Sequence, residues 1–195
     1  MELSRETIEA INLKCHDMRH QIRTLARESG VVDQGVIDDM EHQIRLYDSS
    51  VRTGNDALDT ILTEKGLLCE RRSITLSSIA DGSALGFMPV SDVYSLFGNA
   101  LDNAIEAVDR LADPTRRVIS LDVRTRRSVL VMSVENYCDF VPQFRDGLPV
   151  SERGEGHGYG MRSMRVTAER WGGSLSATCE NGLFRLGIII PLPKD

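Results

Sequence analysis

Apolar residues recur at a helical spacing along the first part of the chain. From Ile8 to Leu25, and again from Ile37 to Val51, they follow one another at alternating intervals of three and four residues. A period of about 3.5 residues is typical of helices that pack side by side along one seam. Residues 28–35 contain glycine and polar residues, which indicates that one helix stops there and a second begins.

Leu58, Ile61 and Lys65 continue the phase of the second seam, so the sequence predicts an antiparallel helical hairpin over residues 1–66. Each helix has a single apolar stripe to bury, and a lone hairpin leaves much of it in water. Pairing two hairpins into a four-helix bundle covers the stripes, which predicts a homodimer through the hairpin. A hairpin that packs on the second domain of its own chain is the alternative.

From about residue 67 the pattern changes to short alternating runs separated by turn residues. Such runs predict strands, and the 3.6-residue spacing between them predicts helices. The predicted strands are 73–79, 118–123, 129–134, 174–179 and 183–191, and the predicted helices are 91–111 and 159–171. Residues 137–158 have no sustained period and are rich in glycine, proline and charge, which predicts a long loop of the kind that forms lids.

The predicted fold class is therefore α+β, with two domains. The first domain, residues 1–66, is the antiparallel helical hairpin, which becomes a four-helix bundle on dimerisation. The second domain, residues 67–195, is an α/β sandwich in which helices cover one mixed sheet.

Composition and charge exclude several partners and locations. The formal net charge of −6 gives no overall attraction to nucleic acid or to anionic lipid. The four cysteines form no CxxC pair, so neither a zinc site nor a disulfide framework is expected, and a reducing compartment is favoured. No apolar run in the sequence reaches the roughly 18–20 residues of a membrane span, which predicts a cytoplasmic chain without membrane contact of its own.

The first segment with candidate chemistry is HDMRHQ, residues 16–21. His16 follows an apolar seam residue, so its imidazole lies at the edge of the stripe and is reachable from solvent. A neutral imidazole is a competent nucleophile near neutral pH, and Asp17 can hold the ring in one tautomer and accept its proton. Two ordinary surface histidines are the alternative, and a metal site built from His16 and His20 lacks a third ligand.

The second segment is NALDNAIEA, residues 99–107, within a predicted helix. Asn99, Asn103 and Glu106 fall on one face of that helix. Their oxygens suit Mg²⁺, which prefers hard ligands and keeps several waters and substrate phosphates. The polar outer face of an amphipathic helix is the alternative, but asparagine in a helix interior is mildly unfavourable, which favours a functional role.

The third segment is GEGHGYGMRS, residues 154–163, at the start of a predicted helix. Alternating glycines allow the backbone to approach a ligand closely and to direct N–H groups at phosphate oxygens, and the helix dipole adds to that attraction. The segment is not a P-loop, because the Lys-Ser/Thr ending is absent and no strand precedes it.

These three segments, in this order, resemble a sensor histidine kinase, with dimerisation and phosphoacceptor helices followed by an ATP-binding domain of the Bergerat or GHKL type. Residues 144–173 are particularly similar to the quorum-sensing kinase group. The resemblance implies ATP and Mg²⁺ as ligands, a homodimer, and transfer of the phosphoryl group to an aspartate on the receiver domain of a response regulator. It also implies that the chain is the cytoplasmic part of a membrane-anchored sensor.

Carried over residue by residue, the resemblance implies His16 as phosphoacceptor, Asp17 as its helper, and Asn99 and Asn103 as metal ligands. The complete set of nucleotide-binding residues predicted here is Asn99, Asn103, Glu106, Asn136, Gly156, His157, Gly158, Gly160 and Met161.

Three departures from the family pattern refine these expectations. Asn99 stands where related hydrolases have a water-activating Glu, and losing that base favours histidine as the nucleophile. The adenine-reading DxGxG sequence is missing, and Asn136 could hydrogen-bond adenine through its amide instead. Many kinases of this group have Asn four residues after the phosphoacceptor, where this chain has His20. Gln21 instead matches the HDxxxQ pattern of another kinase group, in which the glutamine orients water to dephosphorylate the partner regulator, so it joins His16 and Asp17 as a catalytic candidate.

Two competing functions remain open at this stage. One is a histidine phosphotransferase or pseudokinase, which has the same architecture but binds no ATP productively, as the missing DxGxG would allow. The other is a Bergerat ATPase or a serine kinase. Asn99 argues against the ATPase and the His16-Asp17 hairpin argues against the serine kinase.

Overall fold

The computed structural model describes residues 52–149 and 159–193. The chain divides into two compact units, Met1–Val51 and Arg52–Asp195. The helical hairpin, its dimer and the catalytic candidates His16, Asp17 and Gln21 fall on or depend on residues 1–51. They lie outside the described residues and stay predictions.

A five-stranded mixed sheet forms the centre of the described unit. Its strands are β1 (Thr75–Ala80), β2 (Val118–Arg126), β3 (Val129–Tyr137), β6 (Ser174–Glu180) and β7 (Leu183–Pro191), in the spatial order β1-β2-β3-β7-β6. β1 runs parallel to β2, and the other neighbouring pairs are antiparallel. The prediction of one mixed sheet is confirmed, with each strand close to its expected place.

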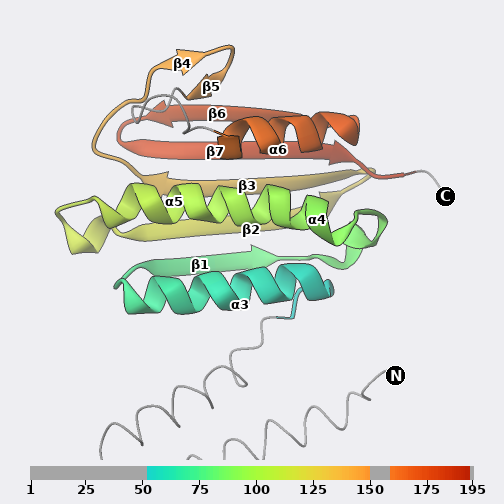
Figure 1. Cartoon of the computed structure of the whole chain (residues 1–195), viewed down its shortest axis with the longest axis horizontal. Helices are drawn as coiled ribbons and strands as arrows, with labels where there is room; N and C mark the ends of the chain where they lie inside the picture. The colour runs from blue at the N-terminus through green and yellow to red at the C-terminus, as the bar shows by residue number, and fades with distance from the viewer. Residues whose placement is uncertain (1–51, 150–158, 194–195) are drawn as a thin grey trace, which may run out of the picture. The chain divides into compact units, whose positions relative to one another are not determined.

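Helices cover one face of this sheet (Figure 1). The helical segments are α3 (Asp56–Arg71), η1 (Ser83–Phe87), α4 (Val90–Val93), η2 (Tyr94–Gly98), α5 (Asn99–Asp109), η3 (Pro114–Arg116) and α6 (Tyr159–Arg170). α3 lies along β1, α5 over β2 and β3, and α6 over β6 and β7. The helix predicted at 91–111 is α4, η2 and α5 in direct succession, where η2 is a π-helical turn.

The hydrophobic core lies between the sheet and the helices. Alternate side chains of β2, β3 and β7 point toward the helices, because successive residues of a strand face opposite ways. These are Ile119, Leu121, Val123, Leu130, Met132, Val134, Leu186, Ile188 and Ile190, each at most 2% exposed. The opposite face carries charged pairs such as Glu135 with Arg185, whose N–O distance is 2.6 Å. This two-sided pattern determines which face the helices cover.

α3 belongs to this unit, although the sequence analysis placed its first two-thirds with the helical hairpin. Leu58 and Ile61 are fully buried, and the Lys65 ammonium lies 2.8 Å from the Asp102 carboxylate on α5. A single apolar stripe looks the same in sequence whether it packs on another helix or along a sheet. The seam therefore predicted the helix but not its partner, and the compact unit begins at residue 52 rather than 67.

The chain enters the unit through a closely bonded turn just before α3. The Thr53 carbonyl accepts a hydrogen bond from the Gly82 N–H at 2.7 Å, and the Thr53 N–H and hydroxyl both donate to Asp59. The Asn55 side chain caps α3 by accepting from the Leu58 N–H at 3.0 Å. A Cβ on Gly82 would lie only 2.6 Å from the Thr53 hydroxyl, so this junction requires glycine there.

The region predicted as a loop, 137–158, contains a small hairpin. β4 (Phe144–Arg145) pairs with β5 (Leu148–Pro149) across a two-residue turn. Asp146 and Gly147 both have positive φ, 52° and 72°, as a type I′ turn requires. The structureless-loop prediction is wrong over these residues, and Asp-Gly was the sequence signal that would have corrected it. The remainder, 150–158, lies outside the described residues.

Candidate functional site

The start of α6 lies directly against the asparagines of α5. A Cβ built on Gly160 would lie 3.3 Å from Asn99 Oδ1 and 3.6 Å from Asn103 Oδ1. Two sequence segments that were expected to bind one ligand are therefore neighbours in space. Glycine at this point lets the α6 backbone come close to both amide oxygens.

The hydrogen bonding of the two amides leaves their oxygens available. Asn99 Nδ2 donates to the carbonyl of Ser95 at 2.7 Å, which fixes the amide and leaves its oxygen on the side of Gly160. The Asn103 side chain has no hydrogen-bond partner among residues 52–149 and 159–193. Both side chains are half-buried. Two oxygen donors of a type that suits Mg²⁺ thus lie beside one helix start.

Ser95 connects these amides to α6, and the sequence analysis missed it. Its hydroxyl lies 2.9 Å from the Ser163 hydroxyl and 3.0 Å from the Thr167 hydroxyl, while its carbonyl accepts from Asn99. A continuous set of hydrogen bonds therefore runs from α6 through η2 to Asn99. Ser163 and Thr167 are four residues apart on one helix face, which is the only trace this link leaves in the sequence.

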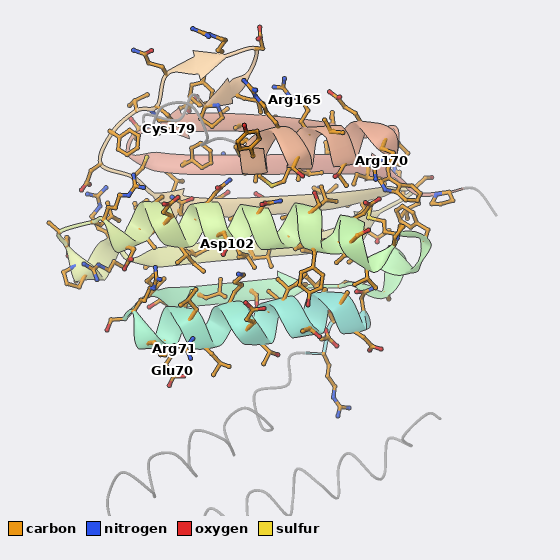
Figure 2. The ribbon with its side chains drawn as sticks, in the orientation of Figure 1. Glu70, Arg71, Asp102, Arg165, Arg170 and Cys179 are labelled. Atoms are coloured by element: carbon orange, nitrogen blue, oxygen red, sulfur yellow. The ribbon has the colours of Figure 1, made fainter. Side chains whose placement is uncertain are left out.

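The C-terminal end of α6 is held by Asp92 of α4. This carboxylate is 6% exposed and accepts hydrogen bonds from Arg170 Nη1 at 3.0 Å and from Trp171 Nε1 at 2.8 Å. The Trp171 ring packs edge-on against Phe87, with centroids 5.1 Å apart. Since α6 is bonded at its middle and at its end (Arg170 is labelled in Figure 2), the position of its first turn is fixed as well.

The first turn of α6 is suited to bind an anion. The helix begins at Tyr159 and runs for 12 residues. The N–H groups of a first helical turn have no partner within the helix and carry the positive end of the helix dipole. A phosphate placed there would also lie beside the Asn99 and Asn103 oxygens, which can share a divalent cation with it.

Asn136 lies at the end of β3, on the face of the sheet that the helices cover. It is 3% exposed, and its Nδ2 donates to the Tyr137 carbonyl at 2.9 Å. Its Oδ1 has no hydrogen-bond partner among the described residues. A buried amide oxygen without a partner is costly, and the amino group of a base such as adenine would satisfy it.

A cluster of polar contacts fixes the segment that follows Asn136. Arg116 pairs with Asp139 at 2.5 Å, donates to the Cys138 carbonyl at 3.3 Å, and lies 5.4 Å from the centre of the Tyr137 ring. The Cys138 N–H donates to the Gly182 carbonyl at 2.9 Å. The end of β3 is therefore held to both the η3 turn and the β6–β7 turn.

α6 also anchors the β4–β5 hairpin. Arg165 on α6 donates to the Asp146 carbonyl at the tip of the turn, and Leu148 of β5 is buried. Figure 2 shows Arg165 on the side of α6 that lies nearest the hairpin. The described part of the predicted lid is thus tied to the same helix whose first turn faces Asn99 and Asn103.

The remaining predicted site residues are less directly placed. Glu106 is exposed and pairs with Arg110 at 3.2 Å, one turn beyond Asn103. Met161 is 7% exposed, so its side chain contributes to the core. Gly156, His157 and Gly158 lie outside the described residues and stay predictions.

The donor set bears on the kind of metal that could bind. Within residues 52–149 and 159–193, no group of three His, Cys, Asp or Glu side chains could hold a metal ion. A cation at Asn99 and Asn103 would therefore depend on amide oxygens, water and the ligand's own phosphates. Mg²⁺ binds in this way, whereas Zn²⁺ does not.

In the same described part of the chain, no helix is long and apolar enough to span a bilayer.

Residues 88–191 match the GHKL domain family, and this stretch is more than half of the chain. The chain therefore belongs to the GHKL-domain family. Domains of this family bind ATP, usually together with Mg²⁺. The curated proteins contain no match to the chain.

Solved structures of histidine kinases have a similar fold. The catalytic domain of the histidine kinase ThkA superposes with a TM-score of 0.55 and 18% identity, covering 71% of this chain and 91% of that domain. A second crystal form of it gives 0.55 and 16%, covering 72% and 94%. The Acinetobacter baumannii histidine kinase AdeS gives a TM-score of 0.48 and 11% identity, covering 92% of this chain and 96% of that one. At these identities the likeness shows the fold alone.

Proposed function

We propose that the chain is a protein-histidine kinase of a two-component system, in which the GHKL domain binds Mg-ATP and His16 receives the γ-phosphoryl group. The main support is that the α6 backbone at Gly160 lies so near the amides of Asn99 and Asn103 that a Cβ there would be 3.3 and 3.6 Å from their oxygens. It brings a helix start suited to phosphate beside oxygens suited to Mg²⁺. The fold shared with histidine kinase catalytic domains is consistent with this function.

Each residue of the site has a distinct part in the proposal. Asn99 and Asn103 would hold Mg²⁺, N–H groups of Gly156–Gly160 would hold the phosphates, and Asn136 would accept a hydrogen bond from the adenine amino group. Mg-ATP, when bound, would supply the phosphoryl group, and the Mg²⁺ would neutralise part of the negative charge on the phosphates. Asn99 cannot act as a general base, so water at this position is not activated and histidine competes better for phosphorus.

The proposed acceptor is His16, on the helical hairpin that the sequence predicts before α3. His16 would attack in line while Asp17 takes its proton, and the phosphoryl group would then pass to an aspartate on a response-regulator receiver domain. Gln21 would orient water in the reverse, dephosphorylating reaction. The hairpin would pair with its copy in a homodimer, and the chain would be the cytoplasmic part of a membrane-anchored sensor of the quorum-sensing group.

A labelling experiment tests the assignment. The full chain is incubated with γ-labelled ATP and Mg²⁺, and the protein-bound label is tested for the acid lability and base stability of phosphohistidine. His16→Gln should abolish this label, and His20→Gln, the same change four residues later in the sequence, should keep it. Asn103→Ala should reduce labelling, while the variant itself remains folded. Label that persists in His16→Gln would refute His16 as the acceptor.

A pseudokinase is the second candidate, and the end of β3 is the observation that favours it. The kinases that this chain resembles read adenine with an aspartate, and here the position is the amide Asn136. Asn136 Nδ2 already donates to the Tyr137 carbonyl, so only the neutral Oδ1 can accept from the adenine amino group, and that hydrogen bond is weaker than one to a carboxylate. Calorimetry with a non-hydrolysable ATP analogue distinguishes the candidates, because a pseudokinase gives no Mg²⁺-dependent heat.

A further inference from the structure

Two cysteines meet beside the end of β3. Cys138 directly follows the strand and is 6% exposed, and Cys179 lies on β6 and is half-buried. Their Sγ atoms are 3.0 Å apart, and both thiols are free. β7 lies between β3 and β6 in the sheet, so this contact joins two strands that are not hydrogen-bonded to each other.

The two sulfurs are already close to bonding distance. A disulfide has an S–S length of about 2.05 Å, so an approach of about 1 Å completes it. Figure 2 shows Cys179 at the end of the sheet nearest the β4–β5 hairpin. Cys69, by contrast, is 1% exposed on α3, and no other described cysteine bonds to it.

We propose that Cys138 and Cys179 form a redox-active dithiol whose oxidation to a disulfide weakens nucleotide binding at the adjoining site. The bond itself does not depend on the proposed function, whereas its consequence for the nucleotide rests on that function.

The chemistry needs a mild oxidant, for which a peroxide is sufficient. Burial, and then the neighbouring Cys179 thiol, raise the pKa of Cys138 to about 12, so Cys138 stays protonated near neutral pH. The more exposed Cys179 therefore reacts first: its sulfur attacks the peroxide, giving a sulfenic acid and releasing water. The Cys138 sulfur then displaces the sulfenic hydroxyl, a second water leaves, and the S–S bond forms. A dithiol reductant reverses the step by exchange.

The contacts around the pair explain why oxidation should reach the nucleotide. Cys138 is two residues from Asn136, and the Asn136 amide is held by the carbonyl of the residue between them. The Cys179 thiol also donates a weak hydrogen bond to the Phe140 carbonyl, at 3.9 Å. A disulfide has no S–H and cannot make this bond. Oxidation thus draws Cys138 toward β6 and releases Phe140, so the amide of Asn136 is displaced from its present position.

Peptide mapping tests the bond without reference to nucleotide. Each cysteine falls in its own tryptic peptide: 15–19, 66–71, 128–145 and 171–185. After the native full chain is treated with hydrogen peroxide, alkylated and digested, the expected product is peptide 128–145 linked to peptide 171–185, which dithiothreitol separates. Cys179→Ala should abolish the linked peptide, and the matched control Cys69→Ala should retain it. Absence of this linkage in the oxidised wild type would overturn the proposal.

Nucleotide binding tests the consequence. Calorimetry with a non-hydrolysable ATP analogue should show affinity falling about tenfold on oxidation of the wild type and returning with dithiothreitol. Cys179→Ala should bind equally before and after peroxide. A linked peptide with unchanged affinity would overturn the regulatory claim. If the reduced wild type bound no nucleotide, the proposed function and this claim would fall together, while the mapping would still decide the bond.

Discussion

At the scale of single residues, Gly160 determines how closely α6 can approach the amides of Asn99 and Asn103. The glycines were singled out from the sequence for their flexibility. The structure gives Gly160 a different part, since it lies within α6 and the decisive property is the missing Cβ. Which of several glycines meets an amide depends on the tertiary packing of α6, and a spacing pattern does not contain that information.

Gly160→Ala should weaken binding of the ATP analogue. The added Cβ would lie 3.3 Å from Asn99 Oδ1, closer than ordinary contact, and would occupy the side of the amides from which a ligand comes. We expect a loss of about tenfold or more in affinity by calorimetry.

Gly66→Ala is the matched control, because Gly66 is also within a helix and has nothing within 4 Å of its Cβ position. Gly66→Ala should leave the melting temperature unchanged or slightly raised, since alanine favours helix. The melting temperature of Gly160→Ala is measured beside it to verify that this variant is folded. Equal affinity in wild type and Gly160→Ala would show that the nucleotide does not approach these amides.

Two buried thiols give the second residue-scale prediction, which concerns alkaline pH. Burial raises the pKa of Cys69 from 9.0 to about 11, and burial with the Cys179 contact raises that of Cys138 to about 12. The unfolded chain loses these protons above pH about 9 and the folded chain keeps them, so stability is full below pH 9 and falls as the pH rises. The expected loss is about 1 kcal/mol per thiol per pH unit between 9 and 11.

Urea unfolding at several pH values measures this loss. The double variant Cys69→Ala/Cys138→Ala should show a smaller dependence of the free energy of unfolding on pH above pH 9. An identical pH dependence in wild type and double variant would show that these thiols ionise normally in the folded chain.

At the scale of elements, strand and helix patterns were enough to place the sheet and the helices, but not the bonds between them. The alternation in 118–134 and 183–191 corresponds to side chains that are buried or exposed in turn. The Ser95 link had no sequence signal strong enough to predict it, because its hydrogen bonds depend on α6 lying beside η2. The π-helical turn η2 was not predicted either. The β4–β5 hairpin did have a signal, Asp146-Gly147, which the loop interpretation overlooked.

Ser95→Ala should weaken the packing of α6 against η2 and α5. It removes both hydrogen bonds to α6 but keeps the carbonyl that holds Asn99. We expect a cost of about 1–2 kcal/mol in the free energy of unfolding, and a loss of nucleotide affinity because α6 is less well positioned.

A double-mutant cycle between Ser95→Ala and Thr167→Val measures how much of that cost belongs to their shared bond. Ser163→Ala, at the more exposed of the two partners, should have the smaller effect. Strictly additive effects of Ser95→Ala and Thr167→Val would show that the hydroxyl contact contributes nothing to the packing of α6.

At the scale of the whole molecule, α3 determines where a stable fragment can begin. Leu58 and Ile61 are fully buried in the unit that starts at Arg52, and each contributes about 1.5–3 kcal/mol by leaving water. A fragment of residues 67–195, cut at the boundary that the hydrophobic pattern predicted, loses both side chains and most of α3.

We expect the fragment 52–195 to unfold cooperatively and the fragment 67–195 to lose most of its stability, since a typical domain has only about 5–15 kcal/mol in total. Thermal unfolding followed by circular dichroism compares them. If 67–195 were as stable as 52–195, α3 would be an accessory rather than a part of the core.

The hydrogen bonds at Thr53 have a mechanical consequence for the start of the GHKL domain. With its carbonyl, N–H and hydroxyl all engaged by Gly82 and Asp59, the peptide chain cannot swivel where it joins this domain. A torque applied to the backbone upstream would not be dissipated at a loose tether there. It would pass into the axis of α3 and, through the Lys65–Asp102 pair, into the helix that carries Asn99 and Asn103, so the GHKL domain would turn as one body.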